Sequence, residues 1–142
     1  IPLTAKAGTM LMRDENNELV AVSTAFAKVV PRLKQVLYYY RTFCAESHRR
    51  NNTSTEMMKF CQNALLEYNL GLQKPEAIGI IIEIESTYVH ERYHEAFWPQ
   101  TSFSFIGYSP RNLPLRVYYF PGFILQTPVQ IVQAKKNTSI TN

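Results

Sequence analysis

The chain has 142 residues, of which 46% are hydrophobic and 18% charged. This composition is typical of one globular domain and excludes a disordered or fibrous protein. The longest apolar run, residues 78–82, is far shorter than the roughly 20 residues that cross a bilayer, so we expect no membrane span. A chain of this size folds without a metal or a disulfide, so we expect no cofactor.

The first residue is isoleucine, and the opening residues lack the pattern of a signal peptide. We therefore expect residues 1–142 to be a single domain excised or processed from a larger chain, with residues 135–142 as a frayed tail. The net charge is +4, and it is segregated along the chain. Residues 24–54 carry six basic side chains against one acid, whereas residues 96–142 carry no acid. Such segregation indicates an anionic partner, or one half of the domain neutralising the other.

In chain order, residues 9–12 and 19–22 flank a polar cluster and predict a hairpin. Two helices are expected next, at about 31–47 and 55–70. The first is indicated by apolar residues at three- and four-residue spacing, namely Leu33, Val36, Leu37, Tyr40 and Cys44. The second follows Thr53 and Glu56, which have the spacing of a capping box.

The pattern then changes to β structure. Residues 78–84 predict a central strand buried on both faces, and alternating residues at 102–105, 115–119 and 129–131 predict half-buried strands. The predicted fold is therefore α+β. It has an N-terminal hairpin, an antiparallel helix pair, and a mainly antiparallel sheet of four or five strands covered on one face by the helices.

The sharpest motif is His90-Glu91-Arg92-Tyr93-His94. On a helix, His90 and His94 stand one turn apart and can share a zinc ion, with Glu91 as the base that activates the metal-bound water. The five residues resemble the motif of zinc proteases. They depart from that family because no third ligand follows Glu95 and because Arg92 is charged. A solvated polar segment is the competing interpretation, with residues 88–97 as either helix or strand.

The second candidate is a basic stripe on the first predicted helix. Arginine and lysine side chains can neutralise phosphates, and a tyrosine among them can stack on a base. An ordinary solvated helix face explains the same charges. The predicted nucleic-acid or anion-binding residues are Lys34, Tyr38, Arg41, His48, Arg49 and Arg50.

Aromatic residues gather around a predicted turn at 120–123, where Pro and Gly occupy the type II positions. Exposed aromatic side chains favour protein interfaces, although the same rings could fill the core. The predicted protein interface consists of Tyr118, Tyr119, Phe120 and Phe123. Cys44 and Cys61 are expected to be buried thiols, with a disulfide as the alternative.

Phosphate-loop, dinucleotide-binding and nucleophile-elbow motifs are missing. The sequence therefore predicts a non-enzymatic interaction or structural domain that binds protein, and single-stranded nucleic acid through the basic helix face. A protein partner or homo-oligomer is expected. The alternative function is a zinc-dependent hydrolase using residues 90–94.

Overall fold

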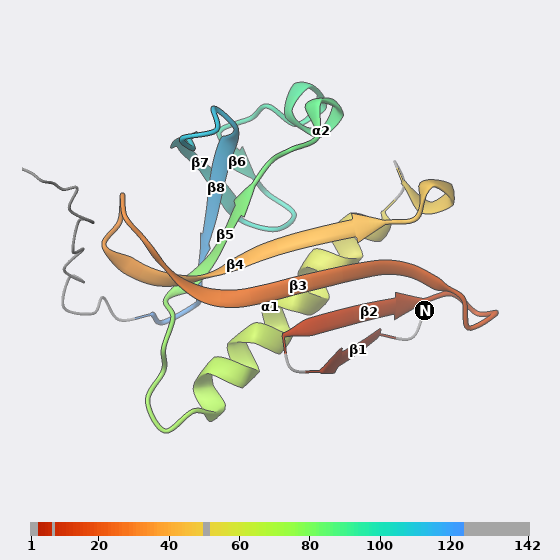
Figure 1. The fold of residues 1–142 in the computed structure, drawn as a ribbon, viewed down its shortest axis with the longest axis horizontal. Coiled ribbons are helices and arrows are strands. Elements are labelled where there is room, and N and C mark those ends of the chain that lie inside the picture. The colour runs from red at the N-terminus through yellow and green to blue at the C-terminus, as the bar shows by residue number, and fades with distance from the viewer. Residues whose placement is uncertain (1–2, 7, 50–51, 124–142) are drawn as a thin grey trace, which may run out of the picture.

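Eight strands form a single sheet in the computed structural model, which describes residues 3–6, 8–49 and 52–123. The strands are β1 (Leu3–Lys6), β2 (Thr9–Arg13), β3 (Leu19–Val30), β4 (Gln35–Cys44), β5 (Gly79–Glu83), β6 (Phe97–Trp98), β7 (Phe103–Tyr108) and β8 (Pro114–Tyr119). Their order is β1-β2-β3-β4-β5-β8-β7-β6, and β4 with β5 is the one parallel pair in this described sheet. Figure 1 shows that β1–β4 and β5–β8 run in markedly different directions.

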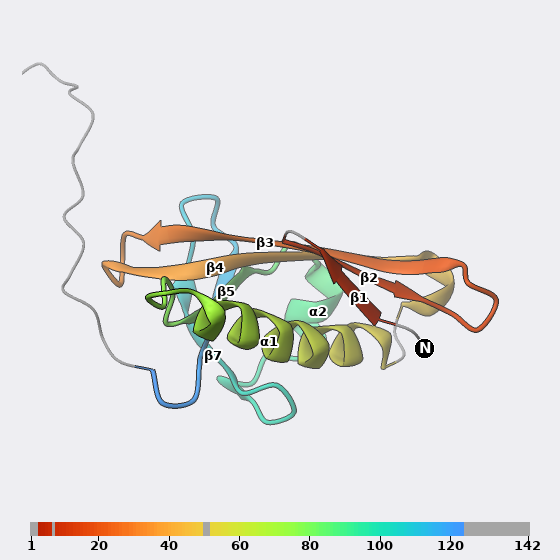
Figure 2. The ribbon, with the colours of Figure 1, turned by 90° about the horizontal axis from the view of Figure 1, so that it is seen from below.

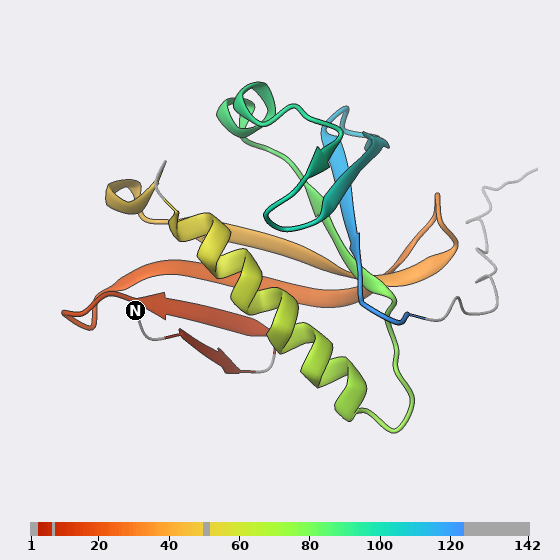
Figure 3. The same cartoon turned by 180° about the vertical axis from the view of Figure 1, so that it is seen from behind.

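One long helix covers one face of this sheet. It is α1 (Thr53–Gly71), and it forms the crossover that a parallel pair requires between β4 and β5. Figures 2 and 3 show α1 lying across the sheet on one side only. The remaining helical pieces are the short 3-10 turn η1 (Glu46–His48) and the six-residue α2 (Thr87–Arg92).

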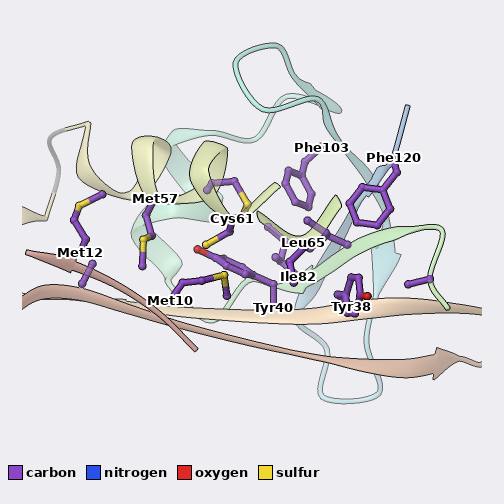
Figure 4. Close-up of a cluster of buried hydrophobic side chains, with 14 of the residues drawn as sticks. Met10, Met12, Tyr38, Tyr40, Met57, Cys61, Leu65, Ile82, Phe103 and Phe120 are labelled. Carbon is purple, nitrogen blue, oxygen red and sulfur yellow. The ribbon is translucent and has the colours of Figure 1, made fainter. Parts of the chain in front are cut away.

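The larger core lies between α1 and the sheet. It is rich in sulfur, since all four methionines of the chain are buried there, and Figure 4 shows three of them, Met10, Met12 and Met57, beside Cys61. Within this core the hydroxyls of Ser23 and Tyr40 lie 2.7 Å apart, so these buried polar groups satisfy each other. Both cysteines of the chain are free thiols, and burial raises the pKa of Cys61 to about 11.

A smaller cluster lies on the opposite face of the sheet. Leu37, Ile81 and Val117 are buried there, although no described helix covers this face. The β3–β4 turn is tied to β7 beside this cluster, since Arg32 donates hydrogen bonds to the carbonyls of Ile106 and Tyr108 at 2.9 and 2.7 Å. The centre of the sheet is therefore buried on both faces.

The predicted fold class is wrong, because it placed a helix pair where the structure has a strand and a single helix, and because it counted too few strands. Residues 35–44 are strand β4, so the expected helix at 31–47 and the antiparallel helix pair do not exist, and the described sheet has eight strands rather than four or five. Pro31 lies in the β3–β4 turn, between the paired residues Val30 and Gln35. Strand β4 is buried on both faces, so its sequence shows no alternation of apolar and polar residues. Its apolar residues therefore also matched the spacing of a helix by coincidence.

Several elements agree with expectation. The 9–22 hairpin is present in the pairing of β2 with β3, the second helix is α1, and β5 is a buried central strand. The cap of α1 is Asn52 rather than Thr53, so the capping box is wrong. The strand predicted at 129–131 and the tail at 135–142 lie outside the described residues. No helix in the described ranges is long and apolar enough to cross a membrane.

Candidate functional site

The parallel strands β4 and β5 separate in the middle of the sheet. Their ladder has only three residue pairs and ends at Tyr40 opposite Ile82. Beyond that point β4 stays paired with β3 as far as Cys44, while β5 follows β8. Figure 1 shows β4 continuing toward η1 while β5 turns toward α2. We call this divergence the β4–β5 fork, and the carboxyl ends of parallel strands are where α/β proteins commonly bind ligands.

Helix α1 begins beyond the β4 end of the fork. Its cap residue Asn52 makes no side-chain hydrogen bond to the first turn. The backbone N–H groups and the positive end of the helix dipole favour an anion at such a terminus. Arg49 stands just before it, with its guanidinium 5.4 Å from the Phe43 ring centre and donating to the carbonyl of Cys44 at 3.0 Å. The exposed Ser54 adds a hydroxyl in the first turn.

The β5 side of the fork leads into α2 and the segment after it. The Ser86 hydroxyl caps α2 by accepting a hydrogen bond from the amide of Val89 at 3.2 Å. The helix ends at Arg92, and the carbonyl of Tyr93 then accepts a hydrogen bond from the Trp98 indole at 2.8 Å. Tyr93 as a whole residue is 45% exposed, so it is partly open to solvent although its carbonyl is held by a hydrogen bond.

A charged cluster lies across the fork on the face away from α1. The Tyr39 hydroxyl donates to Glu83 at 2.6 Å, and Arg111 reaches both Glu83 and Glu85, at 3.2 and 3.3 Å. Arg41, one residue past the last β4–β5 pair, contacts Glu85 at 3.1 Å. This cluster therefore joins the two strands after their backbone ladder has ended.

The cluster changes the acidity of its members. Burial and the bond to Glu83 raise the pKa of Tyr39 to about 12. Burial pushes the pKa of Glu83 upward, but hydrogen bonds from Ser109 and Tyr39 and the charge of Arg111 outweigh it, so the pKa is lowered. Glu83 is therefore a firmly ionised carboxylate at neutral pH.

The predicted basic stripe is not one surface. Tyr38 is buried on the α1 side, whereas Arg41 is exposed on the opposite face. Lys34 lies in the β3–β4 turn, at the far end of β4 from His48 and Arg49. The stripe was derived from helical spacing, and successive residues of a strand point to opposite faces instead.

Arg50, the last member of the stripe, lies outside the described residues. Of the other members, Arg49 borders the fork and Arg41 takes part in its charged cluster. The stripe therefore contributes two residues to the region of the fork, in a different arrangement from the one expected.

The predicted zinc motif does not assemble. Helix α2 ends at Arg92, so His90 lies on the helix while His94 lies beyond it. Within the described ranges, no three His, Cys, Asp or Glu side chains are grouped to hold a metal ion. Glu91 is exposed and forms no part of such a group.

The predicted aromatic interface is divided between the core and the surface. Phe120 is buried and Tyr118 packs beside it, with ring centres 6.0 Å apart. Tyr119 and Phe123 are exposed and stack on each other with ring centres 5.0 Å apart. An interface at this pair stays a prediction.

Comparison with known proteins gives a result at the level of structure alone. No family model matches the chain, and no curated protein matches it in sequence. Solved structures do match. An acetyltransferase of the GNAT family from Listeria monocytogenes has a TM-score of 0.55 and 16% identity, covering 79% of this chain and 64% of its own.

The fold is GNAT-like. Two structures of the toxin AtaT have the same fold, each with a TM-score of 0.54. The complex with acetyl-methionyl-tRNAfMet is 10% identical and covers 78% of this chain and 69% of AtaT. A mutant bound to the antitoxin AtaR and acetyl-CoA is 11% identical and covers 79% and 66%. The present chain therefore spans about two thirds of the length of these GNAT-like proteins.

This likeness overturns the function predicted from the sequence. Among the similar structures, one is described as a GNAT acetyltransferase and one as a phosphinothricin N-acetyltransferase, rather than as non-enzymatic interaction domains or zinc hydrolases. The predicted site residues did not include Glu83 in β5, Arg116 in β8 or Tyr93 just after α2. A signal was present in Arg116, a charged residue among the apolar ones of a predicted strand, but only the partner strands show which way its side chain points.

Proposed function

We propose that this chain is the acetyl-transfer domain of a GNAT-like enzyme that moves an acetyl group from acetyl-CoA to an amine. The observation that carries the proposal is the β4–β5 fork, placed beside the N-terminus of α1 in a sheet of GNAT-like order. The similar AtaT structure holds acetyl-CoA, and another similar structure is described as an N-acetyltransferase. Both facts support the proposal.

The two sides of the fork suit the two parts of acetyl-CoA. Its phosphates would lie at the N-terminus of α1, near Arg49 and the hydroxyl of Ser54. Its amide-bearing arm would run along residues 41–44 of β4, whose edge toward β5 has no strand partner in the described sheet. Extended groups bind such edges by adding to the sheet. The loop entering α1 holds no glycine, so hydroxyl side chains would share in contacting the phosphates.

The reaction needs a site for the amine and a proton for the leaving sulfur. The amine nitrogen attacks the thioester carbonyl, the C–N bond forms as the C–S bond breaks, and the amine loses a proton while the thiolate gains one. The amine must arrive neutral. On the face away from α1 the carboxylates of Glu83 and Glu85 are balanced by Arg41 and Arg111, so the cluster would offer polar contacts rather than excess negative charge. Tyr93 supplies an accessible phenol on the β5 side of the fork, as the proton donor.

The test is binding of acetyl-CoA by calorimetry, followed by acetylation of an amine panel containing a polyamine, an aminoglycoside, a lysine peptide and an aminoacyl-tRNA. Ser54→Glu places a negative charge in the first turn of α1, and we expect it to weaken acetyl-CoA binding at least tenfold. Asn63→Glu is the matched control, because Asn63 is exposed on the same helix but more than two turns further along.

Both variants should remain folded, since each residue is exposed and acids near a helix N-terminus are stabilising. Equal affinity in wild type and Ser54→Glu would exclude phosphate binding at α1. Absence of acetyl-CoA binding by the wild-type chain would refute the proposed function.

A further inference from the structure

Arg116 is a buried charge that is held by backbone rather than by a carboxylate. The residue is 2% exposed, and burial lowers the pKa of its guanidinium, against the opposing charge of Glu95. In the described ranges no carboxylate lies within ion-pair distance of it. Burying an arginine without such a partner is costly, so its remaining contacts must compensate.

Within the described residues, its side-chain hydrogen bonds all go to the segment that follows α2, although the guanidinium also lies 6.0 Å from the centre of the Phe105 ring in β7. The guanidinium donates hydrogen bonds to the carbonyls of Glu95 at 2.6 Å, Tyr93 at 3.2 Å and Ala96 at 3.5 Å. It also lies over the Trp98 ring, 4.0 Å from its centre. Arg116 therefore holds the 93–98 segment in place, a stretch with only two residues of strand pairing of its own.

Tyr93 receives support from both parts of this arrangement. Its carbonyl accepts hydrogen bonds from Arg116 and from the Trp98 indole. Its ring meets the Trp98 ring edge-on, with centres 6.5 Å apart, and the guanidinium in turn covers Trp98. The position of the phenol thus depends on Arg116 through both backbone and ring contacts.

The sheet register places this arrangement at the fork. Arg116 in β8 pairs with Ile82 in β5, the same residue at which the β4–β5 ladder ends. The segment also lies on the α1 side of the sheet, because Trp98 packs against the core between α1 and the sheet. Tyr93 is therefore held on the α1 side of the sheet, where the acetyl-CoA of the proposed function would enter.

We propose that Arg116 is a positioning residue for acetyl transfer, and that it acts by holding Tyr93 where its phenol protonates the leaving thiolate. The inference rests on the proposed function. It explains why a buried guanidinium directs its hydrogen bonds at the carbonyls of one segment, and it identifies residues 93–98 as the wall of the fork opposite β4.

The test is a double-mutant cycle measured with acetyl-CoA and the most rapidly acetylated amine of the panel. Tyr93→Phe removes the proton donor and should lower kcat about 100-fold. Arg116→Met should lower kcat at least 10-fold and leave the KM for acetyl-CoA within about twofold, because the residue would act only on the transition state. Arg116→Lys should restore part of the loss, since an ammonium can donate to the same carbonyls.

The decisive readout is the double variant. If Arg116 acts through Tyr93, the Tyr93→Phe/Arg116→Met enzyme should be no more than about threefold slower than Tyr93→Phe alone. Arg32→Met is the matched control, because Arg32 also donates to two backbone carbonyls, those of Ile106 and Tyr108, but does not touch the 93–98 segment. It should keep kcat within about twofold.

The outcomes separate the two proposals. The role of Arg116 would be overturned if the two fold-losses in kcat multiplied in the double variant. It would also be overturned if kcat of Arg116→Met fell only in proportion to its folded fraction. Either result would leave the proposed acetyl transfer standing. If Arg116→Met does not fold, Arg116→Lys carries the same cycle. A wild-type chain that acetylates no amine and binds no acetyl-CoA would overturn both.

Discussion

The two halves of β4 have opposite surroundings although they belong to one strand. Residues 35–40 pair with β3, and the last three of them also pair with β5. Their side chains are mostly buried on both faces, with Leu37 wholly inaccessible. Residues 41–44 pair with β3 alone, and three of the four are exposed. The first half joins β3 to β5, whereas the second half has one edge without a strand partner in the described sheet. The transition occurs at Tyr40, which lies opposite Ile82.

The largest expected effect comes from the paired half. Ile80 is fully buried in β5 opposite Tyr38, so Ile80→Ala creates a cavity and should lower the free energy of unfolding by about 2–5 kcal/mol. Urea denaturation followed by circular dichroism measures it. A loss below about 1 kcal/mol would mean that the centre of the sheet can relax around the cavity.

The next effect concerns Glu83, at the point where the strands part. Its carboxylate accepts hydrogen bonds from Tyr39 and Arg111, so Glu83→Gln should cost about 1–3 kcal/mol at pH 7. Because folding lowers the pKa of Glu83, this stabilisation is present above the ordinary carboxyl pKa and is lost as the pH falls through the lowered folded value. Denaturation from pH 7 down to pH 2 should show the two proteins converging in acid.

The control for that experiment is Glu67→Gln, which changes an exposed carboxylate on α1. It should shift stability by less than about 0.5 kcal/mol. A gap between wild type and Glu83→Gln that stays constant with pH would show that the carboxylate is not the stabilising group.

A smaller effect is expected from the ion pair across the fork. Arg41 and Glu85 are 62% and 45% exposed, and exposed pairs contribute at most about 1 kcal/mol. A double-mutant cycle with Arg41→Ala and Glu85→Ala should give a coupling energy below that limit, and 1 M salt should reduce it. A coupling that salt does not change would indicate a contact less exposed than the structure shows.

The smallest effect belongs to the open half of β4. Phe43 is 69% exposed, so Phe43→Ala should change the free energy of unfolding by no more than about 0.5 kcal/mol. The same denaturation assay measures it. A larger loss would show that a further part of the protein packs on this face, and the contrast between the two halves of β4 would then be weaker.

The sequence correctly predicted those elements whose pattern of apolar residues fitted either a helix or a strand, but not both. Helix α1, the turn at 13–18 and the buried strand β5 all followed from local patterns. Strand β4 did not, because Leu37, Tyr38 and Tyr40 are all buried, on two faces, and such a run fits helical and strand spacing equally well. Mistaking this one element changed the fold class and moved the basic residues onto a helix.

The site was harder to predict because it depends on residues far apart in the chain. Tyr39 contacts Glu83 across 44 positions, and Arg116 contacts Tyr93 across 23. The residue types at 90–94 suggested metal ligands, but the contacts that the structure shows there are hydrogen bonds accepted by the backbone carbonyl of Tyr93. Side-chain partners of this kind follow from strand order, which local patterns do not specify.

The short parallel ladder also has a consequence for how the chain folds. Strands β1–β4 form from hairpins between neighbouring segments, and β7 and β8 form another, but Tyr38–Tyr40 and Ile80–Ile82 meet only after about 40 residues of chain have been ordered. The two halves of the sheet are therefore expected to join late in folding, through three residue pairs, α1, the shared core and the side-chain contacts across the fork. A ligand bound across the fork would contact both halves, so it would raise the midpoint temperature of unfolding.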